Sequence, residues 1–149
     1  MMGHFSYDAE RRLLRAGDRS WPAQWKSADR EDDFAYRHRQ AIVMLESGHH
    51  ISTIWGTGTY STNRDSFPGQ PPQPFTEEPA HVEIAVLLGG EHMAEFGVVG
   101  DEWHDTVRGW VDVDDFTMTA DWLAQLPSDV DAAQTFVPIF HADLEAMLS

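Results

Sequence analysis

Residues 80–88 read AHVEIAVLL, and this stretch decides the class of fold. Apolar side chains recur at every second position, and a β-strand places alternate side chains on opposite faces. The pattern predicts a strand whose first face is wholly apolar and carries Val82, Ile84, Val86 and Leu88. The second face is mixed and carries His81, Glu83, Ala85 and Leu87. A strand of this kind covers a core with one face, so we expect a sheet.

The segments before this strand are predicted to be another strand and a long loop. Residues 50–63 (HISTIWGTGTYSTN) are rich in β-branched and aromatic side chains, which favour a strand. Gly56 and Gly58 are interpreted as strand bulges rather than as a phosphate-binding loop. Residues 64–79 (RDSFPGQPPQPFTEEP) hold five of the chain's eight prolines, which is typical of a loop.

Three segments have the pattern of helices. Residues 7–18 form a short candidate that ends at a glycine. Residues 29–50 form the strongest candidate, because apolar side chains fall at helical spacing, acids crowd the first turn and Gly48 follows the end. Residues 117–129 are predicted to be a helix that stops at Pro127.

The remaining segments complete the expected architecture. Residues 108–115 are predicted to form an edge strand, whereas residues 89–103 are compatible with either helix or strand. Residues 135–149 are predicted to form a strand, a break at Pro138 and a closing helix. We therefore expect an α+β fold in which helices pack on a mostly antiparallel sheet, as a single domain over residues 1–149.

Charge is distributed unevenly along the chain. The net charge is −15, but residues 1–64 are close to neutral, with nine Arg or Lys and eight Asp or Glu. Residues 65–149 hold 17 Asp or Glu, and Arg108 is their one basic residue. Such a surface repels phosphate backbones and speeds encounter with a basic protein. We expect a protein partner, with a basic one favoured by this charge, and no nucleic acid; an ordinary solvated acidic surface is the alternative.

Composition also bears on the cellular compartment. Cysteine is absent, which excludes disulfides, thiolate zinc sites and cysteine nucleophiles. No apolar run reaches the roughly 18 residues of a membrane span, and the first residues lack the order of a signal peptide. We expect a cytoplasmic protein that does not contact membranes, although the absence of cysteine does not by itself exclude export.

Eight histidines raise the question of a metal site. His81 and Glu83 share one face of a strand and match the H-x-E of zinc deaminases, but the paired cysteines of that chemistry are missing. His141 and Glu145 lie one helical turn apart, which is equally an ordinary exposed pair. His104 and Asp105 have no accompanying nucleophile motif. We expect no metal, no other cofactor and no enzymatic activity.

Two other functions stay open at this point. One is a metal-dependent hydrolase that uses His81, Glu83 and His104. The other is a small-molecule-binding domain in which tryptophans form the pocket walls. Otherwise, the tryptophans of the C-terminal half are expected to be core or half-buried packing residues; these are Trp103, Trp110 and Trp122.

Three stretches taken in order resemble the suppressor-of-fused (SUFU) domain family. They are ISTIWGTGTYS (51–61), PAHVEIAVLLGG (79–90) and TFVPIFHADLEAML (135–148), and ADWLAQLPSD (120–129) is similar to the family's Leu-Ala segment. Val111 stands where the family has a proline. The resemblance covers about residues 50–149 and implies an α+β domain that binds proteins without catalysis. Bacterial members are associated with immunity to toxins, and animal members sequester a transcription factor.

The loop at residues 64–79 is the predicted binding segment. Its prolines restrict the unbound chain, so ordering it on a partner costs less than ordering a glycine-rich loop. Its candidate contacts are two apolar anchors and two acids, namely Phe67, Phe75, Glu77 and Glu78. The alternative is a plain hairpin connection whose phenylalanines cap the core.

Overall fold

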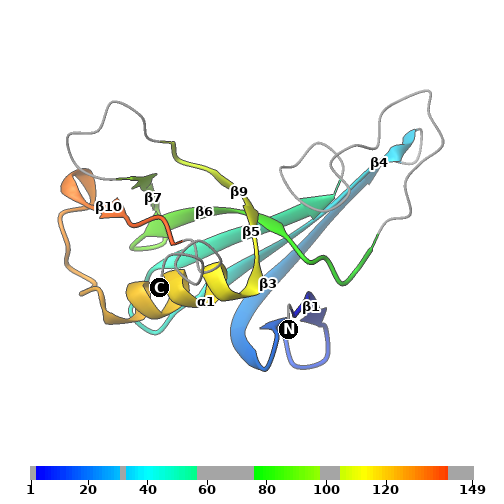
Figure 1. Cartoon of the computed structure of the whole chain (residues 1–149), viewed down its shortest axis with the longest axis horizontal. Helices are drawn as coiled ribbons and strands as arrows, with labels where there is room; N and C mark the ends of the chain where they lie inside the picture. Colours follow the sequence, from blue (N-terminus) through cyan, green and yellow to red (C-terminus); the bar gives the residue numbers. More distant parts are fainter. Residues whose placement is uncertain (1–2, 31–32, 57–75, 98–104, 141–149) are drawn as a thin grey trace, which may run out of the picture.

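The computed structural model describes residues 3–30, 33–56, 76–97 and 105–140 (Figure 1). Its main element is an eight-stranded sheet in the order β1-β2-β3-β4-β5-β6-β7, with β9 also paired to β6. Every pairing within this sheet is antiparallel. Its strands are β1 Phe5–Asp8, β2 Leu13–Ala16, β3 Arg19–Arg30, β4 Asp33–Met44, β5 His50–Gly56, β6 Val82–Leu88, β7 His92–Met93 and β9 Arg108–Val111.

One α-helix lies in the described part of the chain, and it packs on this sheet. Helix α1 (Val113–Gln125) is followed by a short 3-10 helix, η1 (Ala132–Gln134). Strand β10 (Phe136–Val137) then pairs in parallel with β8 (Glu95–Phe96). The expected α+β class with a mostly antiparallel sheet is therefore confirmed. None of the helices described here is long and apolar enough to cross a membrane.

The helix predicted at residues 7–18 is wrong, because this segment forms the β1–β2 hairpin and the turn into β3. Leu14 faces the core and pairs with Tyr7 on one side and Trp21 on the other. The predicted stop at Gly17, with φ 62°, closes a two-residue turn between strands instead. A glycine in such a turn is a hairpin signal as well as a helix stop.

The helix predicted at residues 29–50 is also wrong, because strand β4 occupies most of it. Pairing on both sides, with β3 and with β5, satisfies the backbone of β4. Ala41 and Val43 are buried, whereas Met44 is exposed, so the period is two residues in this part. Strand β4 ends at Met44, and Gly48, with a φ of 93°, lies in the turn between β4 and β5 rather than at a helix end. Tertiary pairing overrode the helical spacing.

Strand β6 matches its prediction closely. Its four predicted core side chains are all buried, and the alternate residues are partly exposed. Strand β5 begins at His50 as predicted and ends at Gly56, beyond which residues 57–63 lie outside the described chain. The undecided segment 89–103 contains a turn and then strands β7 and β8, with residues 98–104 not described.

The C-terminal elements agree with part of their predictions. Strand β9 confirms an edge strand, but it ends at Val111, since Asp112 already caps helix α1. Helix α1 ends just before Pro127, as expected. Strand β10 and the break at Pro138 are present, while the closing helix predicted beyond them falls outside the described residues.

The core lies between the sheet and helix α1 (Figure 1). Phe116 of α1 meets the ring of Phe5 edge-on at 5.4 Å and the ring of Trp21 at 5.1 Å. At the other end of this face, Trp25 stacks on Tyr7 and tilts against Trp55. Aromatic rings therefore join the N-terminal strands to both the helix and the middle of the sheet.

Candidate functional site

Two of the four residues predicted for the binding loop lie in the described chain. The Glu77 carboxylate accepts a hydrogen bond from the Arg39 guanidinium at 3.0 Å, and the Glu77 side chain is 58% exposed. Glu78 is exposed, and its backbone N–H donates to Thr76 Oγ1. Phe67 and Phe75 lie outside the described residues, so their role as anchors stays a prediction.

The end of this loop is held against the core. The Trp55 indole N–H donates to the Thr76 carbonyl at 3.1 Å, and the Phe5 N–H donates to the Pro79 carbonyl at 2.9 Å. Since Arg39 also holds Glu77, Glu78 is the more accessible of the two predicted acids. A partner that binds here would contact a loop end that these hydrogen bonds hold in place.

Two of the residues considered for a metal site, His81 and Glu83, lie in the described chain. The His81 ring meets the Trp110 ring edge-on at 6.2 Å, and Glu83 lies on the same face of β6. Within the described ranges, no group of three His, Asp or Glu side chains could hold a metal ion. His104, His141 and Glu145 lie outside those ranges.

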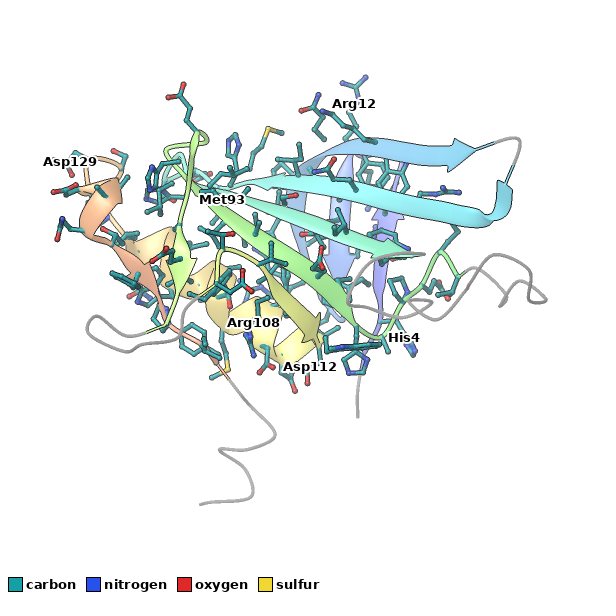
Figure 2. All side chains as sticks on the ribbon, turned by 90° about the horizontal axis from the view of Figure 1, so that it is seen from above. His4, Arg12, Met93, Arg108, Asp112 and Asp129 are labelled. Atoms are coloured by element: carbon teal, nitrogen blue, oxygen red, sulfur yellow. The ribbon has the colours of Figure 1, made fainter. Side chains whose placement is uncertain are left out.

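Arg108 has a structural role at the junction of β9 and α1. Its guanidinium forms an ion pair with Asp115 at 3.1 Å and donates to the Phe140 carbonyl, and both ionic side chains are at most 10% exposed. Burial lowers the pKa of Arg108, and the charge of Asp115 opposes this effect. Figure 2 shows Arg108 beside helix α1. The pair thus links β9, the helix and the C-terminal segment.

The backbone of β9 has an unusual conformation at Trp110. Its φ is 54°, in the left-handed region that bulky residues rarely adopt, and this costs of order 1–3 kcal/mol. Val111 pairs with Val82 and is buried, while the Trp110 side chain is 50% exposed. The sequence predicted a core or half-buried position, and Trp110 is half exposed rather than in the core. Trp122 does pack against the core, and Trp103 lies outside the described chain.

We define the Trp110 surface as Trp110, His81, Glu83 and Asp114. The His81 ring contacts Trp110 and lies on the same face of β6 as Glu83, whereas Asp114 is exposed in the first turn of α1, four residues after Trp110. The ring face of an exposed indole can receive a cation, and Glu83 and Asp114 add negative charge to this surface. The sequence did hold a signal for this surface, because a buried Val111 requires its neighbour in the strand to point outward.

Charge is also segregated across the fold. The described bases that are exposed are all on β1–β3 and their connecting turn, namely Arg11, Arg12, Arg15, Arg19 and Lys26. Four exposed acids lie on β8, in the turn before β7 and in the segment after α1, namely Glu91, Glu95, Asp129 and Asp131, whereas Glu10 and Asp18 are exposed in the same turns as the bases. In Figure 2, Asp129 lies at the left end of the molecule and Arg12 lies at its upper edge, away from Asp129.

Two grooves lie along β3, and a tryptophan lines each of them. The larger has a volume of about 630 Å³ and runs beside the turn between β1 and β2, against Trp25. The smaller, of about 320 Å³, lies between Trp21 and helix α1, where Arg19 and Asp121 form an ion pair at 2.8 Å. Both volumes fall within the range that is usual for small-molecule sites.

Comparison with protein-family models, with curated proteins and with solved structures found no match to this chain.

Proposed function

We propose that this chain is a non-enzymatic protein-binding domain whose Trp110 surface docks a basic protein. The observation that carries the proposal is the conformation of Trp110, which is half exposed and held at a φ of 54°. A strained backbone conformation persists only where the surrounding structure holds it, and such residues cluster at functional sites. Tryptophan is also among the residues that contribute most to binding energy at protein interfaces.

The charge around Trp110 favours a cationic partner. Asp114 is exposed nearby, Glu83 lies on the adjoining face, and the sequence from residue 65 onward has Arg108 as its one base. The Arg108 side chain is 10% exposed and faces Asp115, so it contributes little positive charge to the surface. Complementary charge of this kind raises association rates and selects partners by sign.

An immunity protein that occludes a toxin is the specific form of this proposal. The resemblance of three stretches to the SUFU family supports it, since bacterial members of that family are associated with such immunity. The acidic surface supports it as well, because a basic toxin would be attracted to it over long range. A cytoplasmic location fits the same role, since that is where a toxin of this kind would act.

The test is a pull-down from the native host with the immobilised chain, followed by an affinity measurement on the purified partner. We expect a basic partner encoded beside this gene, with binding that weakens as salt rises. Asparagine tolerates the left-handed backbone conformation. The variant Trp110→Asn should weaken binding at least tenfold, about 1.4 kcal/mol.

Met93→Gln is the matched control, because Met93 is equally exposed, at 48%, but lies away from the Trp110 surface on β7. Circular dichroism should show that both variants are folded. A folded Trp110→Asn variant that binds as tightly as the wild type would refute the docking site. The absence of any protein partner and of a neighbouring toxin gene would refute the immunity role.

A further inference from the structure

Strand β3 is much longer than the strand that covers its edge. β2 pairs with it only from Arg19 to Pro22, and a single further bond joins the Ala23 N–H to the Arg12 carbonyl at 3.0 Å. The Tyr7 hydroxyl donates to the Ala23 carbonyl at 3.2 Å, so both backbone groups of Ala23 have partners on the β2 side. β3 continues to Arg30, paired with β4 alone among the described strands.

The direction of the open backbone groups follows from this register. In an antiparallel sheet, the N–H and C=O of a residue point to one neighbouring strand, and those of the next residue point to the other. Ala23 points toward β2, so Gln24 points toward β4 and Trp25 points again to the open side. No described residue hydrogen-bonds the N–H or C=O of Trp25 there. Edge groups of this kind are a template for another strand.

The larger groove runs along this open edge. Arg11 and Arg12 line it from the β1–β2 turn, and Pro22 and Met44 give it apolar walls. The stacked rings of Tyr7 and Trp25, 4.4 Å apart and nearly parallel, also line it. Its volume of about 630 Å³ can accommodate several side chains of an extended peptide.

The charge of the groove differs from that of the rest of the molecule. Arg11, Arg12 and Lys26 are exposed, and no ion pair between described residues involves any of them. These three positive charges attract an anionic ligand to the groove.

We propose that the open edge of β3 binds an extended acidic peptide segment of a partner protein by strand addition. The peptide main chain pairs with Trp25, its carboxylates meet Arg11 and Arg12, and its alternate apolar side chains rest against Pro22 and Met44. In this mode, main-chain bonds give affinity and the pockets for alternate side chains give specificity. This site is on other strands than the Trp110 surface and does not depend on it.

The probe for the test is a fluorescein-labelled octapeptide that alternates valine and glutamate and is blocked at both ends. Fluorescence anisotropy should show binding by the full chain, and the same peptide with lysine in place of glutamate should bind at least tenfold more weakly. Arg11→Gln combined with Arg12→Asn should reduce the affinity tenfold or more. Arg15→Gln is the matched control, because Arg15 is exposed on β2 and already paired with Asp8.

Further measurements separate strand addition from simple charge attraction. On binding, hydrogen exchange of the Trp25 amide should slow, and a peptide N-methylated at alternate residues should lose its affinity. Equal binding by the methylated peptide, or no binding by the unmethylated one, would overturn the proposal. Self-association that protects the same amide would identify a second copy as the occupant and overturn it too. Trp110→Asn should leave peptide binding unchanged. The peptide site on β3 and the basic partner at the Trp110 surface can therefore be refuted independently of each other.

Discussion

The His49 Nδ1 atom accepts a hydrogen bond from the backbone N–H of Gly89 at 3.0 Å, across 40 residues of sequence. The Nε2 atom lies 3.3 Å from the Leu126 carbonyl oxygen and 3.1 Å from that of Pro127, so it carries the ring proton and donates to both. The ring is wholly buried. One histidine thus joins the β4–β5 turn, the β6–β7 turn and the end of helix α1.

His49→Ala should lower the free energy of unfolding by about 2–4 kcal/mol, because it leaves three buried backbone groups without this partner and opens a cavity. Urea denaturation measures the loss. His50→Ala is the control, since His50 is partly exposed on the outer face, and it should cost about 1 kcal/mol or less. Equal losses for the two variants would contradict the structural role of His49.

The buried ion pair between Arg108 and Asp115 should be costly to break from either side. Arg108→Met or Asp115→Leu alone leaves a buried charge uncompensated and should cost about 3–5 kcal/mol. The double variant should cost less than either single change, because both charges leave together. Arg19→Met, which breaks an exposed pair with Asp121, should cost about 1 kcal/mol or less. A double-mutant cycle by thermal or urea unfolding checks the order.

Asp8 should contribute stability that depends on pH. Hydrogen bonds from the Arg11 N–H and the Arg15 guanidinium lower the pKa of its carboxyl below its ordinary value. The unfolded chain therefore takes up this proton first as pH falls, so the contribution is complete above the unfolded pKa and is lost through the folded pKa. Asp8→Asn should be less stable than the wild type near neutral pH, and the difference should shrink as pH falls through the folded pKa of Asp8. Urea denaturation midpoints of both proteins, measured across the acid pH range, check this. A difference between the two midpoints that stays constant with pH would refute the prediction.

Asp112 should matter to helix α1 more than its neighbour Asp114. The Asp112 carboxylate accepts the Asp115 N–H at 2.8 Å and caps the helix, whereas Asp114 is exposed in the first turn. Asp112→Ala should cost about 1 kcal/mol, and Asp112→Asn only a few tenths, because asparagine caps nearly as well. Asp114→Ala should fall within about 0.5 kcal/mol of the wild type. Chemical denaturation distinguishes these values, and a larger loss at Asp114 would contradict the cap.

The parts of the fold that sequence predicted best are those in which the local pattern and the tertiary surroundings agree. Strand β6 alternates cleanly because its two faces meet a core and solvent, and α1 ends at Pro127 because proline has no N–H to continue it. Strand β4 was missed because its helical spacing competes with a two-residue alternation that is clear only around Ala41 and Val43. Its pairing partners decide between the two, and a local pattern does not contain them.

The candidate sites show the same limit. Glu77 and Glu78 could be selected as surface acids, but the pairing of Glu77 with Arg39 depends on how two strands meet. Trp110 was expected in the core or half-buried because tryptophan usually packs, and it is half exposed, but its left-handed backbone conformation has no mark in the sequence. The open edge of β3 was not predicted, since it arises from a difference in length between two strands, one of which was expected to be a helix.

The order of strands in the main sheet has a consequence for how the chain folds. From β1 to β7, each strand pairs with the one that follows it in sequence, so the sheet can grow by successive hairpins. The turns between these successive strands are short, except between β5 and β6, whereas β-sandwiches must bring distant segments together before their sheets form. The chain needs longer conformational searches to pair β6 with β5 and then to dock β9, α1 and β10. We expect refolding faster than is usual for a protein with this much sheet, with hairpins formed early and the helix packed last.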